Sequence, residues 1–61
     1  MTLKTGDTLR YRDDQSGMTY VVIGANHYAN GMVQTIDLRR SDGVMIQKAL
    51  RVVAEKMEKV Q

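Results

Sequence analysis

Few side chains in this chain could carry out catalysis. Its sole histidine, His27, stands beside Tyr28 in a polar stretch, and histidine is a residue type that can serve as an acid or a base. No serine, cysteine or carboxylate stands at a spacing typical of a nucleophile and its base. Asp13 and Asp14 are adjacent, but turn chemistry explains both. We expect the chain not to be an enzyme, and His27 and Tyr28 to contact a partner; the alternative is an ordinary solvated loop.

The residue types also argue against a metal ion or a cofactor. A zinc site needs several histidine or cysteine ligands, and the chain has one histidine and no cysteine. Its five glycines stand singly, so none belongs to a glycine-rich loop that cradles a phosphate. We therefore expect no metal and no cofactor.

Arginine side chains are the second group of candidate binding residues. Arg10 and Arg12 lie in one stretch of alternating apolar and polar residues, and Arg39 and Arg40 lie at the end of another. If the first, third and fourth predicted strands lie near each other, the guanidinium groups could form one surface for phosphate groups. Lys48 and Arg51 could extend it, and Tyr11 or Tyr28 could serve as a stacking platform. The complete expected partner-binding set is His27, Tyr28, Arg10, Arg12, Arg39 and Arg40.

The simpler alternative for the arginines is a solvated strand face. Outward strand positions must be polar, and Arg10 and Arg12 could pair with Asp13, Asp14 or Asp37. Nine basic against seven acidic residues give a net charge of +2, a mild excess. This balance permits a nucleic-acid partner without requiring one.

The stretches that must position these residues have the pattern of strands. Residues 18–39 contain two β-branched and aromatic runs separated by the polar segment 25–31, which predicts a hairpin. Gly24, at the end of the first run, predicts a bulge or bend. Turns are expected at residues 13–17 and 40–43. The predicted strands are 8–12 with Leu9 and Tyr11 inward, 19–23, 32–39 with Ile36 and Leu38 inward, and 44–47.

The C-terminal segment allows two interpretations. Ile46, Leu50, Val53, Met57 and Val60 recur at spacings of four, three, four and three, which is typical of one helix face. We expect a helix over residues 49–59, although no Ser, Thr, Asp or Asn caps its start. The alternative is a single helical turn at 48–50 followed by a short strand at 51–54.

Size and composition indicate one small domain over residues 1–61. At this length only about 60% of the unfolded surface can be buried, so oligomerisation or a partner surface would add stability. Five methionines and no phenylalanine or tryptophan favour an adaptable apolar surface. No apolar run approaches the roughly 20 residues of a membrane span, and no signal-peptide pattern opens the chain. We expect a soluble cytoplasmic protein that does not bind a membrane.

The order of these features resembles an SH3-like small barrel: mainly β, with four to five antiparallel strands and a short C-terminal helix. The resemblance rests on the Gly6-Asp7 lead into a basic strand, the long central hairpin, the Ser41-Asp42-Gly43 turn and the amphipathic tail. The outline is also similar to very small phage and prophage proteins of uncharacterised function. A mobile-element origin is what this similarity implies.

The plasmid-borne trimethoprim-resistant dihydrofolate reductase, a tetramer of SH3-like barrels, has a similar outline. Residues 6–10 resemble its lead-in, and residues 44–47 fall near its active-site strand. That family carries Gln, Ile and Tyr consecutively on this strand, whereas Gln47 is followed here by Lys48 and Ala49. Without the triplet, the resemblance does not extend to the reductase activity.

Three functional hypotheses remain. The first is a non-enzymatic binding module, of phage or mobile-element type, that binds and modulates a larger host or defence protein complex. The second is a nucleic-acid-binding barrel that uses an arginine-rich strand face. A third class, an oligomeric enzyme with a pore on its symmetry axis, would require the chain to self-associate. The expected partner is therefore a larger protein, with nucleic acid and a second copy of the chain as alternatives.

Overall fold

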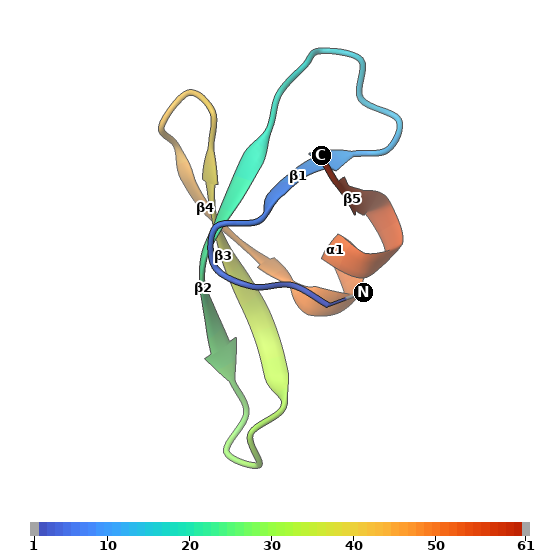
Figure 1. Ribbon diagram of the computed structural model, residues 1–61. Coiled ribbons are helices and arrows are strands. Elements are labelled where there is room, and N and C mark those ends of the chain that lie inside the picture. Colours follow the sequence, from blue (N-terminus) through green and yellow to red (C-terminus); the bar gives the residue numbers. More distant parts are fainter. Residues whose placement is uncertain (1, 61) are drawn as a thin grey trace.

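The computed structural model describes residues 2–60. Its elements follow the order β1 (Thr8–Tyr11), β2 (Tyr20–His27), β3 (Val33–Arg40), β4 (Met45–Ala49), α1 (Leu50–Lys56) and β5 (Met57–Lys59). The five strands form one antiparallel sheet in the order β4-β3-β2-β1-β5 (Figure 1). The predicted fold class, mainly β with antiparallel strands and a short helix near the C-terminus, is confirmed.

The β2–β3 hairpin is the longest feature, and it projects well beyond the other strands (Figure 1). Helix α1 connects β4 to β5, which are the two edge strands of the sheet. It packs against β3, β4 and β5, so the curved sheet and the helix enclose one core. The helix thus links the two edge strands and packs against both of them.

Among residues 2–60, the core contains seven buried side chains from both halves of the chain. Ile36 and Leu38 are 3% and 0% exposed, as predicted for the inward face of β3, and Leu9 of β1 is 0% exposed. Tyr11 is half-buried, and its ring meets that of Tyr20 edge-on with the centroids 5.4 Å apart. The buried set is Leu9, Tyr20, Val22, Ile36, Leu38, Val53 and Met57.

Gly24 marks an irregularity in β2, as predicted. The register against β3 shifts between Val22 and Gly24, which is a β-bulge. A Cβ atom at this position would lie 3.5 Å from Oδ2 of Asp37. The glycine therefore leaves the Asp37 carboxylate lying close over the backbone of β2.

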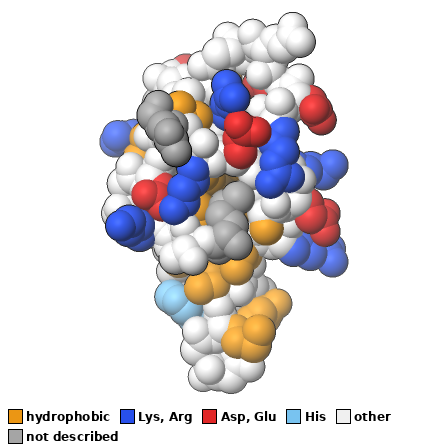
Figure 2. Space-filling view, turned by 45° about the vertical axis from the view of Figure 1, so that its right-hand side comes forward, with side chains coloured by type: hydrophobic (Ala, Val, Ile, Leu, Met, Phe, Trp, Pro, Cys, Tyr) orange, Lys and Arg blue, Asp and Glu red, His pale blue; other side chains and the backbone are white. Residues whose placement is uncertain are grey.

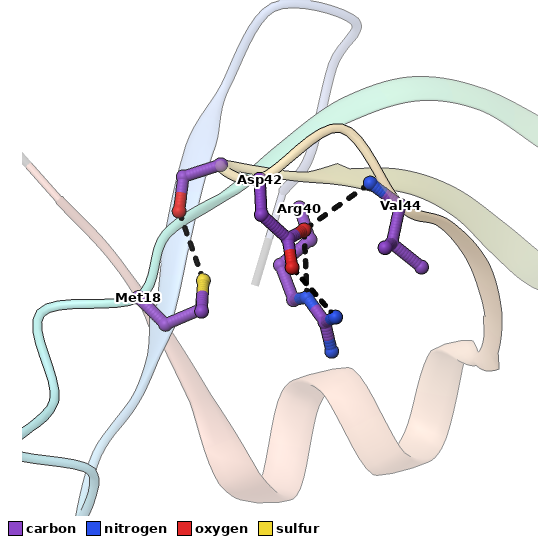
Figure 3. Close-up of polar contacts among 5 residues, drawn as sticks. Met18, Arg40, Asp42 and Val44 are labelled. Carbon is purple, nitrogen blue, oxygen red and sulfur yellow. Dashed lines mark hydrogen bonds and ion pairs between the residues drawn. The ribbon is translucent and has the colours of Figure 1, made fainter.

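Asp42 organises the turn between β3 and β4 (Figure 3). Arg40 donates two hydrogen bonds to its carboxylate, Nε to Oδ1 at 2.9 Å and Nη2 to Oδ2 at 2.7 Å, and the Val44 N–H donates to Oδ1 at 3.2 Å. Gly43 has a φ of +93°, a conformation that glycine adopts without strain. Because Arg40 above all, and then the Val44 N–H, stabilise the ionised form, the pKa of Asp42 falls from 3.8 to about 2.

This turn is expected to lose stabilising energy in acid. A carboxyl group whose pKa is lower in the folded than in the unfolded protein stabilises the fold at pH values above its unfolded-state pKa. This contribution to the free energy of unfolding is lost as the pH falls through the folded-state pKa, here between about pH 4 and about pH 2. Asp42→Asn should therefore be less stable than the wild type at pH 6, and the difference should shrink at about pH 2.5. Urea unfolding of both proteins at the two pH values measures it. A difference that stays constant with pH would contradict this origin.

The central loop is shorter than predicted. Residues 25–27, which the sequence placed in a loop, continue β2 to His27, and the connection to β3 occupies only residues 28–32. Asn26 explains the difference, because its Nδ2 donates to Thr35 Oγ1 at 3.0 Å and to Asp37 Oδ1 at 3.1 Å across the hairpin. These cross-strand bonds replace the turn chemistry expected of an asparagine.

The expected C-terminal helix is correct only in its first part. It ends at Lys56, and the next three residues form β5, so neither a helix to residue 59 nor a strand at 51–54 is found. The extended backbone is favoured because Leu9, Arg10 and Tyr11 of β1 pair with this segment. The start of the helix, at Ala49, has no side-chain cap, as the sequence indicated.

Candidate protein-binding surface

The six predicted partner-binding residues lie in separate parts of the molecule. Strand β2 lies between β1 and β3, so the strands that carry Arg10 and Arg39 are not neighbours. Arg12 follows β1 and contacts the C-terminal end of α1, and Arg40 lies at the β3–β4 turn. His27 and Tyr28 are at the far end of the β2–β3 hairpin. Strands β3 and β4 are neighbours, and β2 separates both of them from β1, so one strand lies between Arg10 and Arg39.

Among the described residues two of these arginines form ion pairs, and Arg10 pairs with a different carboxylate from those expected. Arg10 Nη2 lies 3.0 Å from Glu58 Oε2 across β1 and β5, and Arg40 pairs with Asp42. The Arg10 pair is solvent-exposed, which limits its contribution to at most about 1 kcal/mol. Within residues 2–60, Arg39 is exposed and makes no ion pair.

Arg12 binds main-chain carbonyl groups. Its Nη1 donates to the oxygen of Glu55 at 2.6 Å and its Nη2 to that of Ala54 at 3.3 Å, while its backbone N–H donates to the oxygen of Lys56 at 3.0 Å. These carbonyls belong to the end of α1, where the helix dipole concentrates negative partial charge. Arg12 therefore fastens the C-terminal end of α1 to the end of β1.

Arg12→Ala should lower the free energy of unfolding by roughly 1 kcal/mol, because it removes a cation and two donors from the helix end. Arg39→Ala is the matched control, because Arg39 is also an exposed arginine but lacks such contacts among the described residues. Its effect should stay within about 0.5 kcal/mol. Urea unfolding at pH 7 compares the two variants, and equal losses would refute the structural role of Arg12.

The end of the β2–β3 hairpin presents large apolar side chains to solvent. Tyr28 is 51% exposed and Met32 is 63% exposed. Their backbones are held together, because the Tyr28 N–H donates to the Met32 oxygen at 2.6 Å. Figure 2 shows apolar side chains gathered at this end of the molecule, next to the histidine. His27 lies in the same exposed segment, so the structure brings His27 and Tyr28 together.

A groove of about 570 Å³ separates this hairpin end from α1. Half-buried Val33 and Leu50 contribute apolar surface, and Tyr28 lies at its exposed side. Arg51 is the single charged residue among the described residues of the lining. Sequence reasoning missed the groove, because it forms only where β3 passes the helix. The lining residues are Tyr28, Val33, Gln34, Thr35, Ala49, Leu50, Arg51 and Ala54.

A second hollow, of about 400 Å³, lies on the outer face of the sheet around Asp37. Oδ1 of Asp37 accepts hydrogen bonds from Nδ2 of Asn26 and from Nε2 of Gln47, both at 3.1 Å. Ile23 and Met45 line the hollow beside it. The sequence placed Asp37 on the outward face but gave no sign that two amides from neighbouring strands would orient its carboxylate.

Within residues 2–60, no group of three or more His, Cys, Asp or Glu side chains is arranged to hold a metal ion. The same residues contain no helix with the length and apolar character to cross a membrane. Comparisons with protein families, with curated proteins and with solved structures find no match to this chain.

Proposed function

We propose that this chain is a non-enzymatic protein-binding module, of the kind with which a phage or other mobile element modulates a larger host or defence complex. The main support is the apolar groove beside the hairpin end, with Tyr28 and Met32 exposed next to it. Tyrosine and methionine are enriched at protein interfaces, and methionine adapts to the shape of its partner. Covering this surface would also stabilise a domain with a small core.

The groove favours a partner segment that carries an apolar side chain next to a carboxylate. Its lining is largely apolar, and within the described part of the chain Arg51 is its only charged residue. The hairpin end, residues 25–36, contains no acidic side chain that would oppose an incoming carboxylate. An apolar anchor would fill the space between Val33 and Leu50, and the carboxylate would face Arg51.

The test begins with capture of partners from a bacterial lysate with and without nuclease, at low and at high salt. The captured protein is then purified and its dissociation constant is measured with three variants. Tyr28→Ala and Arg51→Glu should each weaken binding at least about tenfold. Val60→Ala, which changes an exposed apolar residue outside the groove, should leave the affinity unchanged.

Two outcomes would contradict the proposal. Equal affinities of all three variants would place the interface elsewhere. Loss of capture after nuclease treatment, with a steep dependence on salt, would favour the nucleic-acid alternative instead. That alternative has weaker support, because Arg10, Arg12 and Arg40 are already engaged within the chain.

A further inference from the structure

The outer edge of β4 carries unpaired backbone groups. Within the described residues β4 pairs with β3 alone. The Arg40 N–H donates to the Val44 oxygen, so Arg40 and Val44 form a hydrogen-bonded pair of the antiparallel ladder. Hydrogen-bonded and non-hydrogen-bonded pairs alternate along such a ladder. By this alternation, Met45 and Gln47 direct their N–H and C=O groups away from β3. These groups can pair with an added strand.

The side chains beside this edge present one acceptor and one donor. Oδ1 of Asp37 is occupied by Asn26 and Gln47, whereas no described residue donates a hydrogen bond to Oδ2. An ionised carboxylate accepts hydrogen bonds at both oxygens, so Oδ2 can receive a cationic donor. Arg39, two residues along the same face of β3, is an exposed cation with no ion pair among the described residues.

The hollow around Asp37 suits the stem of a long basic side chain. Ile23 and Met45 form apolar walls, and Met45 is 61% exposed. Lysine and arginine cover apolar surface with their aliphatic stems while the charged end reaches an acceptor. An added strand would lie about 10 Å from β3, so such a side chain could extend over Gln47 to Asp37.

A second copy of this chain would complement the site poorly. Consider two copies whose β4 strands pair antiparallel, with Gln47 opposite Gln47. The other copy would then place Met45, Gln47 and Ala49 on the outer face beside the site, and none of these residues is charged. Lys48 points to the inner face of this edge, which is a feature that discourages sheets from pairing edge to edge. The occupant must therefore supply charges that the β4 strand of a second copy does not.

We propose that the free edge of β4 binds an extended peptide segment, as an added antiparallel strand, with a basic and an acidic residue two positions apart. The basic side chain lies level with Gln47 and extends toward the carboxylate of Asp37. The acidic side chain lies level with Met45 and faces Arg39, because Arg39 pairs with Met45 in the ladder. This surface is distinct from the groove beside α1, and the proposal does not depend on that groove.

Three synthetic peptides test the proposal: STKTETS, which has the required charges, and the controls STETETS and STKTKTS, each with one charge reversed. NMR titration with the isotope-labelled full-length protein measures the dissociation constants at about 20 mM salt, where screening is weak. STKTETS should bind at least about fivefold more tightly than either control. Its binding should shift and protect from exchange the amides of Met45 and Gln47.

Two conservative variants assign the charges. Asp37→Asn keeps an acceptor for Asn26 and Gln47. In this variant STKTETS should no longer bind more tightly than STETETS, but it should still bind more tightly than STKTKTS. Arg39→Gln should have the converse effect, as a double-mutant cycle requires for independent pairs. Equal binding of the three peptides, or no shift at Met45 and Gln47 with about 2 mM STKTETS, would overturn the proposal. Failure here leaves the groove variants Tyr28→Ala and Arg51→Glu as a separate test of the proposed function.

Discussion

Leu38→Ala should lower the melting temperature by at least about 15 °C. Leu38 is 0% exposed and lies at the centre of the core. Replacing a fully buried leucine with alanine costs about 2 to 5 kcal/mol, because a cavity remains where the side chain was. A chain of this length has only about 3 to 9 kcal/mol of net stability at typical values per residue. The variant should therefore be largely unfolded at 37 °C by circular dichroism.

Met45→Ala is the control for this prediction. Met45 also lies in the β3–β4 ladder, but it is 61% exposed, so its truncation should change the stability by less than about 0.5 kcal/mol. Thermal unfolding of both variants gives the comparison. A similar loss in both proteins would mean that Met45 is covered in solution, for example by a second molecule.

Glu58→Pro should cost about 3 kcal/mol, whereas Lys59→Pro should cost less than about 1 kcal/mol. The Val60 N–H donates to the Thr8 oxygen and the Arg12 N–H to the Lys56 oxygen. Because hydrogen-bonded and non-hydrogen-bonded pairs alternate along an antiparallel ladder, Glu58 and Arg10 form a hydrogen-bonded pair. The N–H of Lys59 therefore points away from β1. Proline at residue 58 removes a ladder hydrogen bond, and proline at residue 59 removes none.

The two proline variants distinguish a strand from a continuous helix at this end of the chain. In a helix over residues 49–59, either proline would remove or obstruct a helical hydrogen bond, so both would be severe. Urea unfolding gives the two free energies. Glu58→Gln, which keeps the backbone bond but removes the charge that pairs with Arg10, separates the exposed ion pair from the ladder.

Local patterns were sufficient for the parts of the fold that depend on neighbours in sequence. Asp42 and Gly43 supply a carboxylate and a positive φ within one turn, and the β3–β4 turn is where they predict it. Alternation likewise placed Leu9 and Leu38 in the core. The end of α1 was different, because Met57 satisfies a helical period and a strand equally well. Pairing with Tyr11, far away in sequence, decided between them.

The candidate site was less accessible from sequence, because its partners are distant. Arg10 pairs with Glu58 and Arg12 binds Glu55, which are 48 and 43 positions away, so no local rule could assign them. The orientation of Asp37 depends on Asn26 and Gln47, which only the strand order brings together. His27 and Tyr28 lie together because they are adjacent in the chain, and their contact with a partner stays a prediction.

The pairing of β1 with β5 also limits when the domain can be completed. Leu9 pairs with Lys59, fifty positions later, whereas short connections join β2, β3 and β4. Closing the longer loop costs more entropy, so the central strands can associate first. Until Met57–Lys59 pair with β1, the chain can thus form only an open three-stranded meander of β2, β3 and β4. In that meander Leu38 lacks the cover of Val53 and Met57, so its apolar side chain is open to non-native contacts.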